Sequence, residues 1–404
     1  MIVNLKNNIL FFHLILQVLL VGLILGLFRT VIPALAEVDF GVPKGSFILL
    51  STFVMSFGLV KGVSNYYAGT FSDRFNRKIV LVAGWILAIP APLLIFYAEN
   101  WYYIILATSI IGIHQGLTWS VTQISSVDIT EQQSRGFAVG LNEFGGYVGV
   151  AFGGILVSYL TDLYDVRTAS LIFSYFIIFI ALLLITFFVN DTKKYINEEN
   201  TKYKVDKTYI KDVFFKVSWK DKRLFSYCQS GHIEKYIDTA VWIFFPVYLY
   251  KIGMPILEIS YIVGIYTVTW GVLQIFTGLY SDYVGRDKLI IFGMVICSII
   301  IAICPIYDSF LWWSINSFIL GVGMAMLYPS ISSAVNDNSN EEWRATAIGV
   351  YRFWRDTGYA SGAILIGIFS SIYTIESSFY FVSVIMLISV IVLINYNRGG
   401  QGQN

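Results

Sequence analysis

Ionisable side chains interrupt several stretches of this sequence that are otherwise apolar. In a helix at the centre of a membrane such a charge costs about 2.5–3.5 kcal/mol, so it normally faces water or pairs with another charge. Charges placed this way form proton relays, ion pathways or ligand sites, and the alternative is a structural ion pair that joins two helices. Nine residues fit this description: Arg29, Lys61, Glu143, Glu234, Lys235, Asp238, Arg352, Arg355 and Asp356.

The densest group of these charges lies at 352–359. Its charged residues and a tyrosine recur at i, i+3, i+4 and i+7, which places them on one face of a helix. They are Arg352, Arg355, Asp356 and Tyr359. Glu234 and Asp238 are four residues apart, so two carboxylates also share a helix face. Glu234 and Lys235 have a second interpretation, in which they lie near an aqueous entrance and are simply solvated.

Two further pairs combine polar and aromatic side chains at helical spacing. His114 and Thr118 share a helix face, with Gln115 beside them. A histidine there is a candidate proton relay, although a lone histidine is more often structural. Trp270 and Gln274 are also four residues apart and could line an apolar cavity that holds a few polar groups.

Nothing in the sequence points to a metal site, a cofactor or an enzyme. The histidines are scattered, and the cysteines lack the spacing of a zinc site or a disulfide framework. A nucleophile–base set facing one compartment is missing as well. The residues concerned are His13, His114, His232, Cys228, Cys297 and Cys304. We therefore expect no enzymatic activity, no metal and no cofactor.

Membrane helices must position these side chains, and the expected fold is all α. Hydrophobic residues make up 56% of the 404 residues and charged residues only 13%, compared with about 25% charged in soluble domains. The net charge of +1 gives no reason to expect nucleic acid as a partner. Twelve apolar stretches are long enough to cross a bilayer. We place them near 9–36, 46–71, 79–97, 101–125, 137–160, 168–189, 224–250, 259–280, 289–307, 310–334, 346–370 and 377–396.

Lysine and arginine are distributed unevenly between the two sets of loops. One set contains most of them, while the other holds only Lys44, Arg167 and Lys251. By the positive-inside rule, both termini and the segment from 190 to 223 are predicted to be cytoplasmic. The expected organisation has three parts. These are an N-terminal six-helix bundle at 1–189, a cytoplasmic linker at 190–223 and a C-terminal six-helix bundle at 224–404.

The two halves repeat one another at a fixed offset. Gly69, in the sequence GTFSDRFNRK, and Gly278, in GLYSDYVGRD, are separated by 278 − 69 = 209 residues. Arg135 and Arg344, which begin two later spans, are separated by 344 − 135 = 209 residues. Two distant motif pairs with one offset indicate an ancient duplication. Membrane folds built from such repeats place their ligand sites at the repeat interface.

The repeated loop resembles the signature of the major facilitator superfamily, which follows a Gly-x-x-x-Asp-Arg-x-Gly-Arg-Lys pattern. The resemblance covers the whole chain, because twelve spans, a central cytoplasmic loop and two motif copies stand where the family has them. The first copy has Asn76 at the usual glycine, and asparagine also tolerates a left-handed backbone. In the second copy Tyr283 replaces the arginine and Asp287 the lysine, so a weaker gate is expected there. The resemblance implies a secondary transporter that works by alternating access.

The motif residues are expected to form a gate between conformations. Asp73 can accept hydrogen bonds from a helix N-terminus, whose dipole favours an anion, and the resemblance implies that this helix is the span near 346–370. Glycines at the helix ends would let neighbouring helices approach closely. The alternative is that the cations only anchor a cytoplasmic loop. The predicted gating residues are Gly69, Asp73, Arg74, Arg77, Lys78, Gly278, Asp282 and Arg286.

The buried charges are confined to particular spans. Four spans contain none of them, namely those near 79–97, 168–189, 289–307 and 377–396. In the superfamily the corresponding helices are peripheral, while the others line a central cavity. By the 209-residue offset Glu143 corresponds to Arg352, and Arg29 to Asp238, so opposite charges could meet across that cavity. The predicted substrate and coupling residues are Arg29, His114, Gln115, Glu143, Glu234, Asp238, Trp270, Gln274, Arg352, Arg355 and Asp356.

The expected function is proton-coupled export of a small organic molecule by a multi-pass monomer in the cytoplasmic membrane. Glu143, Asp238 and Asp356 are the expected proton carriers, because removal from water favours the neutral form of a carboxyl group. The chain departs from the family's drug/proton antiporters, since Gly112 replaces their usual arginine and the span near 137–160 lacks proline. Proton-coupled uptake of a nutrient or metabolite is the rival function. A non-transporting sensor is disfavoured by the intact first motif. Expected partners are the substrate, protons and the lipid bilayer.

Overall fold

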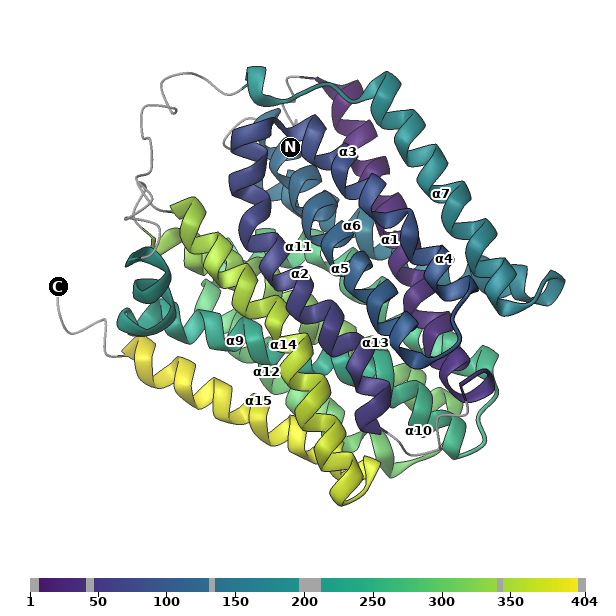
Figure 1. Ribbon diagram of the computed structural model, residues 1–404. Coiled ribbons are helices and arrows are strands. Elements are labelled where there is room, and N and C mark those ends of the chain that lie inside the picture. The colour runs from purple at the N-terminus through teal and green to yellow at the C-terminus, as the bar shows by residue number, and fades with distance from the viewer. Residues whose placement is uncertain (1–6, 41–46, 131–134, 196–211, 340–343, 399–404) are drawn as a thin grey trace. The chain divides into compact units, whose positions relative to one another are not determined.

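The regular elements of this protein are helices throughout the described part of the chain (Figure 1). The computed structural model describes residues 7–40, 47–130, 135–195, 212–339 and 344–398. The chain divides into two units, Met1–Ile196 and Asn197–Asn404, and each is described below by itself.

The N-terminal unit has one helix, or two consecutive helices, at each of its six predicted spans. Side-chain oxygens of Asn7, Asn100 and Asp165 accept from backbone N–H groups in the first turn of three of these helices. The third span is divided at Ile89, because Pro90 suits the first turn of a new helix. The elements are α1 (Asn8–Val38), α2 (Phe47–Phe75), α3 (Arg77–Ala88), α4 (Pro90–Phe96), α5 (Trp101–Asp128), α6 (Arg135–Leu163), α7 (Val166–Phe188) and the 3₁₀ turn η2 (Lys193–Tyr195).

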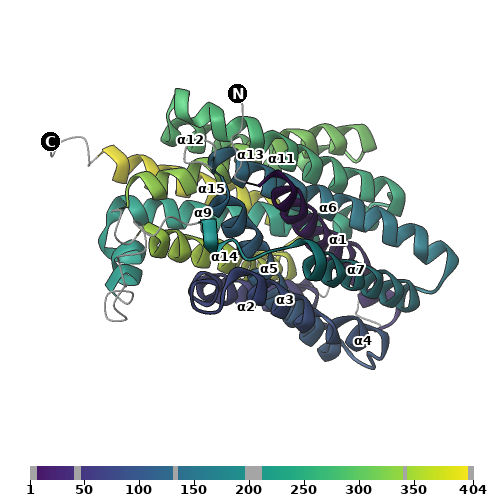
Figure 2. The same cartoon turned by 90° about the horizontal axis from the view of Figure 1, so that it is seen from above.

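The C-terminal unit repeats this order of helices. Its first span is a continuous run of α9, a π-helical turn η5 and α10, and Figure 2 shows α11, α12 and α13 side by side. Residues 212–220, which belong to the predicted linker, are helical, and the π-turn η4 within them packs against α9 and α14. The elements are η4 (Lys216–Lys220), α9 (Lys222–Thr239), η5 (Ala240–Phe244), α10 (Phe245–Lys251), α11 (Ile256–Val284), α12 (Arg286–Ile303), η6 (Cys304–Ile306), α13 (Phe310–Asp337), α14 (Arg344–Ile372) and α15 (Ile375–Arg398).

Within the described residues, nine helical segments are long and apolar enough to cross a membrane. Helices α2, α9 and α14 are not among these nine. Helices α9 and α14 each carry three charged residues close together, namely Glu234, Lys235 and Asp238 in α9 and Arg352, Arg355 and Asp356 in α14. All of these except Arg352, which is partly exposed, are buried inside the protein. Burial among partners removes the cost of exposing them to lipid, so both helices can still lie at membrane depth.

In each unit two helices touch through their backbones. A Cβ atom at Gly149 of α6 would overlap the carbonyl oxygen of Leu19 in α1. A Cβ atom at Gly358 of α14 would overlap the carbonyl oxygen of His232 in α9. These two glycines are 209 residues apart, so the offset found in the sequence also relates these two close helix contacts. Small residues at such contacts allow the close packing that joins membrane helices.

Candidate functional site

The two copies of the loop motif make similar turns in the backbone. Asn76 has a φ of +71°, and Gly285, which occupies the same place in the second copy, has a φ of +95°. Each stands immediately before a helix, α3 or α12. The Asn76 side chain also accepts a hydrogen bond from the backbone N–H of Ile79 at 3.1 Å. The prediction that asparagine preserves the turn is therefore confirmed.

An arginine after each turn forms an ion pair with an aspartate on another helix of the same unit. Arg77 Nε lies 3.1 Å from Asp128 Oδ2 at the end of α5. Arg286 Nε pairs with Asp337 Oδ2 at the end of α13. Arg286 lies 209 residues after Arg77, and Asp337 lies 209 residues after Asp128, so the two ion pairs are related by the repeat offset. These arginines thus hold the start of one helix to the end of another, whatever their part in gating.

We expect Asp128→Asn to destabilise the protein more than its counterpart Asp337→Asn. The Asp128 side chain is 10% exposed and its partner 7%, whereas Asp337 is 48% exposed and Arg286 24%. An exposed pair contributes about 0–1 kcal/mol, whereas breaking a buried pair costs about 3–5 kcal/mol. Thermal stability is compared by heating the two variants in detergent and measuring the protein that remains folded by size-exclusion chromatography. Equal losses of thermal stability would contradict it.

The gating role of the loop motif stays a prediction, because the structure does not describe most of the other motif side chains. Gly69 and the side chains of Asp73, Arg74 and Asp282 lie outside the part that the structure describes. Lys78 Nζ donates to the carbonyl oxygen of Thr186 at 3.3 Å. A Cβ atom at Gly278 would lie 3.5 Å from the side chain of Pro329, which is an ordinary contact. Close helix packing therefore does not require a glycine at that position.

In the N-terminal unit the buried acid Glu143 is held by a tryptophan. The indole N–H of Trp119 donates to Glu143 Oε1 at 2.8 Å, and Glu143 is only 3% exposed. The ammonium of Lys61 lies 5.6 Å from the centre of the Trp119 ring. A Cβ atom at Gly146 would overlap that ring, so α6 must have a glycine here for the tryptophan to fit. Trp119 is thus fixed between a carboxylate and a cation.

The C-terminal unit repeats this contact with the opposite charge. Arg352, the counterpart of Glu143, donates to the hydroxyl of Tyr328 at 2.9 Å, and Tyr328 is the counterpart of Trp119. Arg355, the counterpart of Gly146, lies 4.1 Å from the centre of the Tyr328 ring. The same backbone geometry therefore presents a carboxylate in one unit and two guanidinium groups in the other.

Three charged residues of α9 are completely buried. Glu234, Lys235 and Asp238 each have 0% exposure. The Lys235 ammonium lies 3.4 Å from Asp238 Oδ2 and 3.9 Å from Glu234 Oε1. The interpretation of Glu234 and Lys235 as solvated residues near an entrance is therefore wrong, because neither side chain reaches the surface.

Aromatic groups from two other helices complete the surroundings of Lys235. Its ammonium donates to the hydroxyl of Tyr359 at 3.2 Å and lies 4.6 Å from the centre of the Trp270 ring. The Tyr359 hydroxyl donates in turn to Asp238 Oδ2. Aromatic faces attract a desolvated cation through their quadrupole. The lysine is therefore stabilised by a carboxylate on its own helix and by rings from α11 and α14.

The network continues onto α14 through Arg355. Its Nη2 donates to Glu234 Oε1 at 2.8 Å, and its Nη1 lies 3.9 Å from Asp356 Oδ1. Arg355 and Asp356 are 6% and 3% exposed. With Arg352, Lys235 and Asp238 the cluster has three cations and three acids. We call these six residues, with Tyr328, Tyr359 and Trp270, the C-terminal charge network.

The other predicted cavity residues are buried in less connected surroundings. His114 is fully buried, with its Nδ1 3.0 Å from the carbonyl oxygen of Gly84, and its role as a proton relay stays a prediction. Gln115 and Gln274 are 0% and 1% exposed, and neither side chain has a hydrogen-bond partner among the described residues. Arg29 is 6% exposed. No cluster that could hold a metal ion occurs in the described chain.

Sequence reasoning missed Trp119 and Tyr328 as functional candidates. It placed Lys235 and Tyr359 among the charged and polar residues of the spans, but left both out of the predicted substrate and coupling residues. Trp119 and Tyr328 could have been found, because Tyr328 lies 209 residues after Trp119, just as Arg352 lies 209 residues after Glu143. The burial of Lys235 could not have been predicted, since nothing local in the sequence distinguishes a buried lysine from one at an aqueous entrance.

The repeat, the membrane-length helices and the buried charge network define the class of this molecule. It is a multi-pass membrane transporter built from two related helical halves. The family model of the Major Facilitator Superfamily matches residues 14–231 and 234–402, so the chain belongs to that superfamily. The resemblance stated from the loop motif is confirmed, as is the all-α polytopic fold.

Known proteins similar to this chain include bacterial and human members. The chain is 22% identical over 340 residues to the multidrug resistance protein MdtG of Proteus mirabilis, covering 82% of each protein. It is 22% identical over 339 residues to the protein of the same name from Salmonella typhi, covering 82% of this chain and 81% of the relative. The crystal structure of the human organic anion transporter MFSD10 (TETRAN) has a similar fold, with a TM-score of 0.68 and 14% identity. That match covers 95% of this chain and 99% of the human protein.

Proposed function

We propose that this transporter exports a small organic molecule in exchange for protons, and that Asp238 is the residue that gains and loses the proton. The support is the position of Asp238, which is fully buried and contacts both the Lys235 ammonium and the Tyr359 hydroxyl. A buried carboxylate that has both a cation and a hydroxyl as neighbours can exist in either protonation state with a partner available.

Protonation of Asp238 would redistribute the ion pairs of the network. The neutral acid no longer attracts Lys235, which then keeps Glu234 as its remaining carboxylate at 3.9 Å. Glu234 already holds Arg355 of α14 at 2.8 Å, so the two cations compete for one acid. A proton arriving on α9 therefore weakens the bond between α9 and α14. A protonation event that changes the relative energy of two conformations shifts the population between them.

Export is favoured over uptake by the relatives that this chain resembles. The two bacterial relatives, from Proteus mirabilis and Salmonella typhi, are named multidrug resistance proteins. The predicted cytoplasmic placement of both termini and of residues 190–223 is kept as part of the proposal, because the cations cluster on those segments. We also propose that the first loop motif forms a gate, that the protein is a monomer, and that residues 190–223 link the two helical bundles.

We expect Asp238→Asn to abolish transport driven by a pH gradient while leaving exchange of substrate across the membrane intact. Asparagine keeps the shape and a hydrogen-bond acceptor, but it cannot carry the proton. Proteoliposomes with an imposed pH gradient are tested against a panel of fluorescent organic compounds. The matched control is Asp308→Asn, an exposed acid of the same unit. Export is shown when substrate moves opposite to the proton gradient, and movement with the protons would instead establish uptake.

Asp238→Asn with full gradient-driven transport would overturn the assignment of the carrier. Transport by the wild-type protein that runs only down the concentration gradient of the compound would overturn proton coupling itself. Flux is divided by the amount of protein recovered in the vesicles, so that a variant with low expression can be compared with the wild type.

A further inference from the structure

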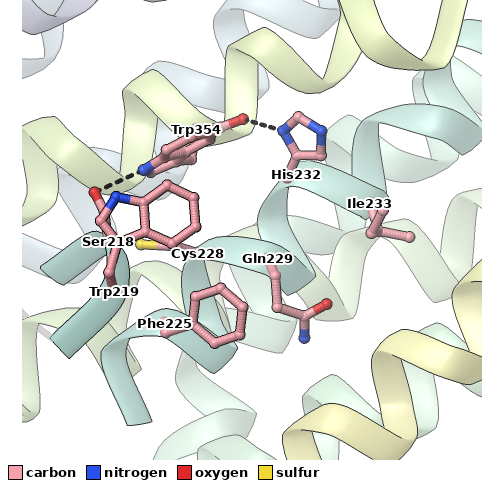
Figure 3. Close-up of a pocket in the computed structure, with 8 residues that line it drawn as sticks. All are labelled: Ser218, Trp219, Phe225, Cys228, Gln229, His232, Ile233 and Trp354. Atoms are coloured by element: carbon pink, nitrogen blue, oxygen red, sulfur yellow. Dashed lines mark hydrogen bonds between the residues drawn. The ribbon is translucent and has the colours of Figure 1, made fainter. Parts of the chain in front are cut away.

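A pocket of about 180 Å³ opens beside α9 in the C-terminal unit, and none of the residues that line it belongs to the charge network. Its walls come from η4, the start of α9 and α14 (Figure 3). The aromatic rings of Trp219, Phe225 and Trp354 line it together with the side chains of Cys228 and Ile233. None of the residues proposed above to take part in transport lines this pocket.

The polar groups in the pocket wall already have partners in the protein. Trp354 donates its indole N–H to Ser218 Oγ at 2.8 Å, and its carbonyl oxygen accepts from His232 Nδ1 at 2.8 Å (Figure 3). The second ring nitrogen of His232 accepts from Ser361 Oγ at 2.7 Å. The Gln229 amide donates to the carbonyl oxygen of Ser389 and accepts from its hydroxyl.

A ligand of this pocket would therefore find mostly apolar surface, because the polar groups of Ser218, Gln229, His232 and Trp354 are already hydrogen-bonded within the protein. A polar occupant would lose its hydrogen bonds with water and gain none in return. A hydrocarbon chain loses nothing and gains burial of its apolar surface. The composition of the wall thus selects an acyl chain rather than a polar small molecule.

The segment that closes the pocket also carries a set of exposed lysines. Phe215 and Trp219 are 47% and 56% exposed, a pattern typical of side chains at a membrane–water interface. Lys216, Lys220 and Lys222 are exposed on the same short stretch. Such mixtures of aromatic residues and lysines on a helical segment bind the surface of anionic membranes.

Two of the acids near these lysines have partners of their own. Arg223 is paired with Asp287 at 3.7 Å, and Asp221 is engaged as the N-cap of α9. Residues 212–223 contain four cations and two acids, a net charge of +2, and Asp287, which pairs with Arg223, reduces the local net charge to +1. An anionic headgroup is therefore attracted to the segment, at the position where an acyl chain could enter the pocket.

We propose that this pocket binds one acyl chain of an anionic phospholipid whose headgroup is held by Lys216, Lys220 and Lys222. The site lies at the membrane surface beside α9, and Trp354 in its wall is the residue before Arg355 of the charge network. The proposal does not depend on which solute the protein transports.

The test uses purified full-length protein in nanodiscs made of phosphatidylcholine. Phosphatidylglycerol with a dibrominated acyl chain is added at low mole fraction, and tryptophan fluorescence is measured, since bromine quenches only the rings that it touches. Dibrominated phosphatidylcholine at the same fraction is the headgroup control. We expect stronger quenching by the phosphatidylglycerol, and a smaller difference between the two lipids in Trp219→Phe, which removes one of the two tryptophan rings that line the pocket.

The variant Lys216→Gln/Lys220→Gln/Lys222→Gln is expected to weaken phosphatidylglycerol binding by about tenfold or more, because each lysine near a membrane surface attracts anionic lipid. The corresponding arginine variant should retain binding, and Lys251→Gln, an exposed lysine at the other end of the α9–α10 run, should not change it. If the glutamine variant does not fold, the same loss is measured on the wild-type protein at high salt, which screens exposed charges.

Equal quenching by both brominated lipids would overturn the proposal, since it indicates contact with the bilayer surface and no headgroup selectivity. Absence of quenching by either lipid would overturn it as well, because the pocket would then be closed to acyl chains. Binding that survives both the glutamine substitutions and high salt would remove the lysines from the site.

Discussion

Replacing Arg355 with alanine is expected to lower the stability of the protein by about 3–5 kcal/mol and to abolish transport. The guanidinium bonds Glu234 at 2.8 Å and covers the ring of Tyr328. Its removal leaves Glu234, which is fully buried, with only the more distant Lys235 as a cation. Breaking a buried ion pair by removing one partner is costly because the other charge remains in a low-dielectric site.

A double variant separates the structural part of this effect from the functional part. Glu234→Leu together with Arg355→Met removes both charges and keeps the volume apolar, a change that is often neutral or stabilising for a buried pair. We expect this variant to recover the thermal stability that Arg355→Ala loses, and still to fail in gradient-driven transport. Recovery of both stability and transport would show that the pair only joins α9 to α14.

Replacing Gly358 with alanine is expected to disrupt the C-terminal unit, although it adds one methyl group. The added Cβ would overlap the carbonyl oxygen of His232 and lie 3.0 Å from the Cβ of Lys235. Both neighbours belong to α9, so α9 and α14 must separate. Overpacking a well-packed contact costs about 1–3 kcal/mol, occasionally more. Here the separation also pulls Arg355 from Glu234, so the loss should exceed that range.

Gly349→Ala on the same helix is the matched control. A Cβ atom there meets nothing within 4 Å, and alanine is about 0.8–1 kcal/mol more favourable than glycine in a helix interior. We therefore expect Gly349→Ala to be neutral or slightly stabilising. Thermal denaturation of both variants in detergent, followed by size-exclusion chromatography, measures the difference. Two variants with equal stability would show that α9 and α14 are not in close contact in the membrane.

The two related units show why a duplicated sequence need not have duplicated chemistry. The contact of Trp119 with Glu143 recurs as the contact of Tyr328 with Arg352, so the pairing geometry is retained while the charge is reversed. Gly146 in one unit corresponds to Arg355 in the other, where the arginine joins Glu234 and Asp356 in the C-terminal charge network. The proposed proton carrier accordingly lies in the C-terminal unit.

Most of the fold was predictable from the sequence because its signals are local. A membrane span is a run of about twenty apolar residues, and its length follows from the thickness of the bilayer. The left-handed turn at Asn76 follows from residue type at one position. The offset of 209 residues is a property of the chain itself, and it relates the turns at Asn76 and Gly285 and the ion pairs Arg77–Asp128 and Arg286–Asp337.

The partners of the buried charges were decided by the tertiary structure alone. The sequence placed Glu234 and Asp238 on one face of a helix, but it left open whether Glu234 and Lys235 were solvated. Their burial depends on how closely α14 approaches α9, and that distance is set by Gly358, more than a hundred residues away in the chain. Ion pairs depend on distances between helices, which hydropathy and spacing along one helix do not contain.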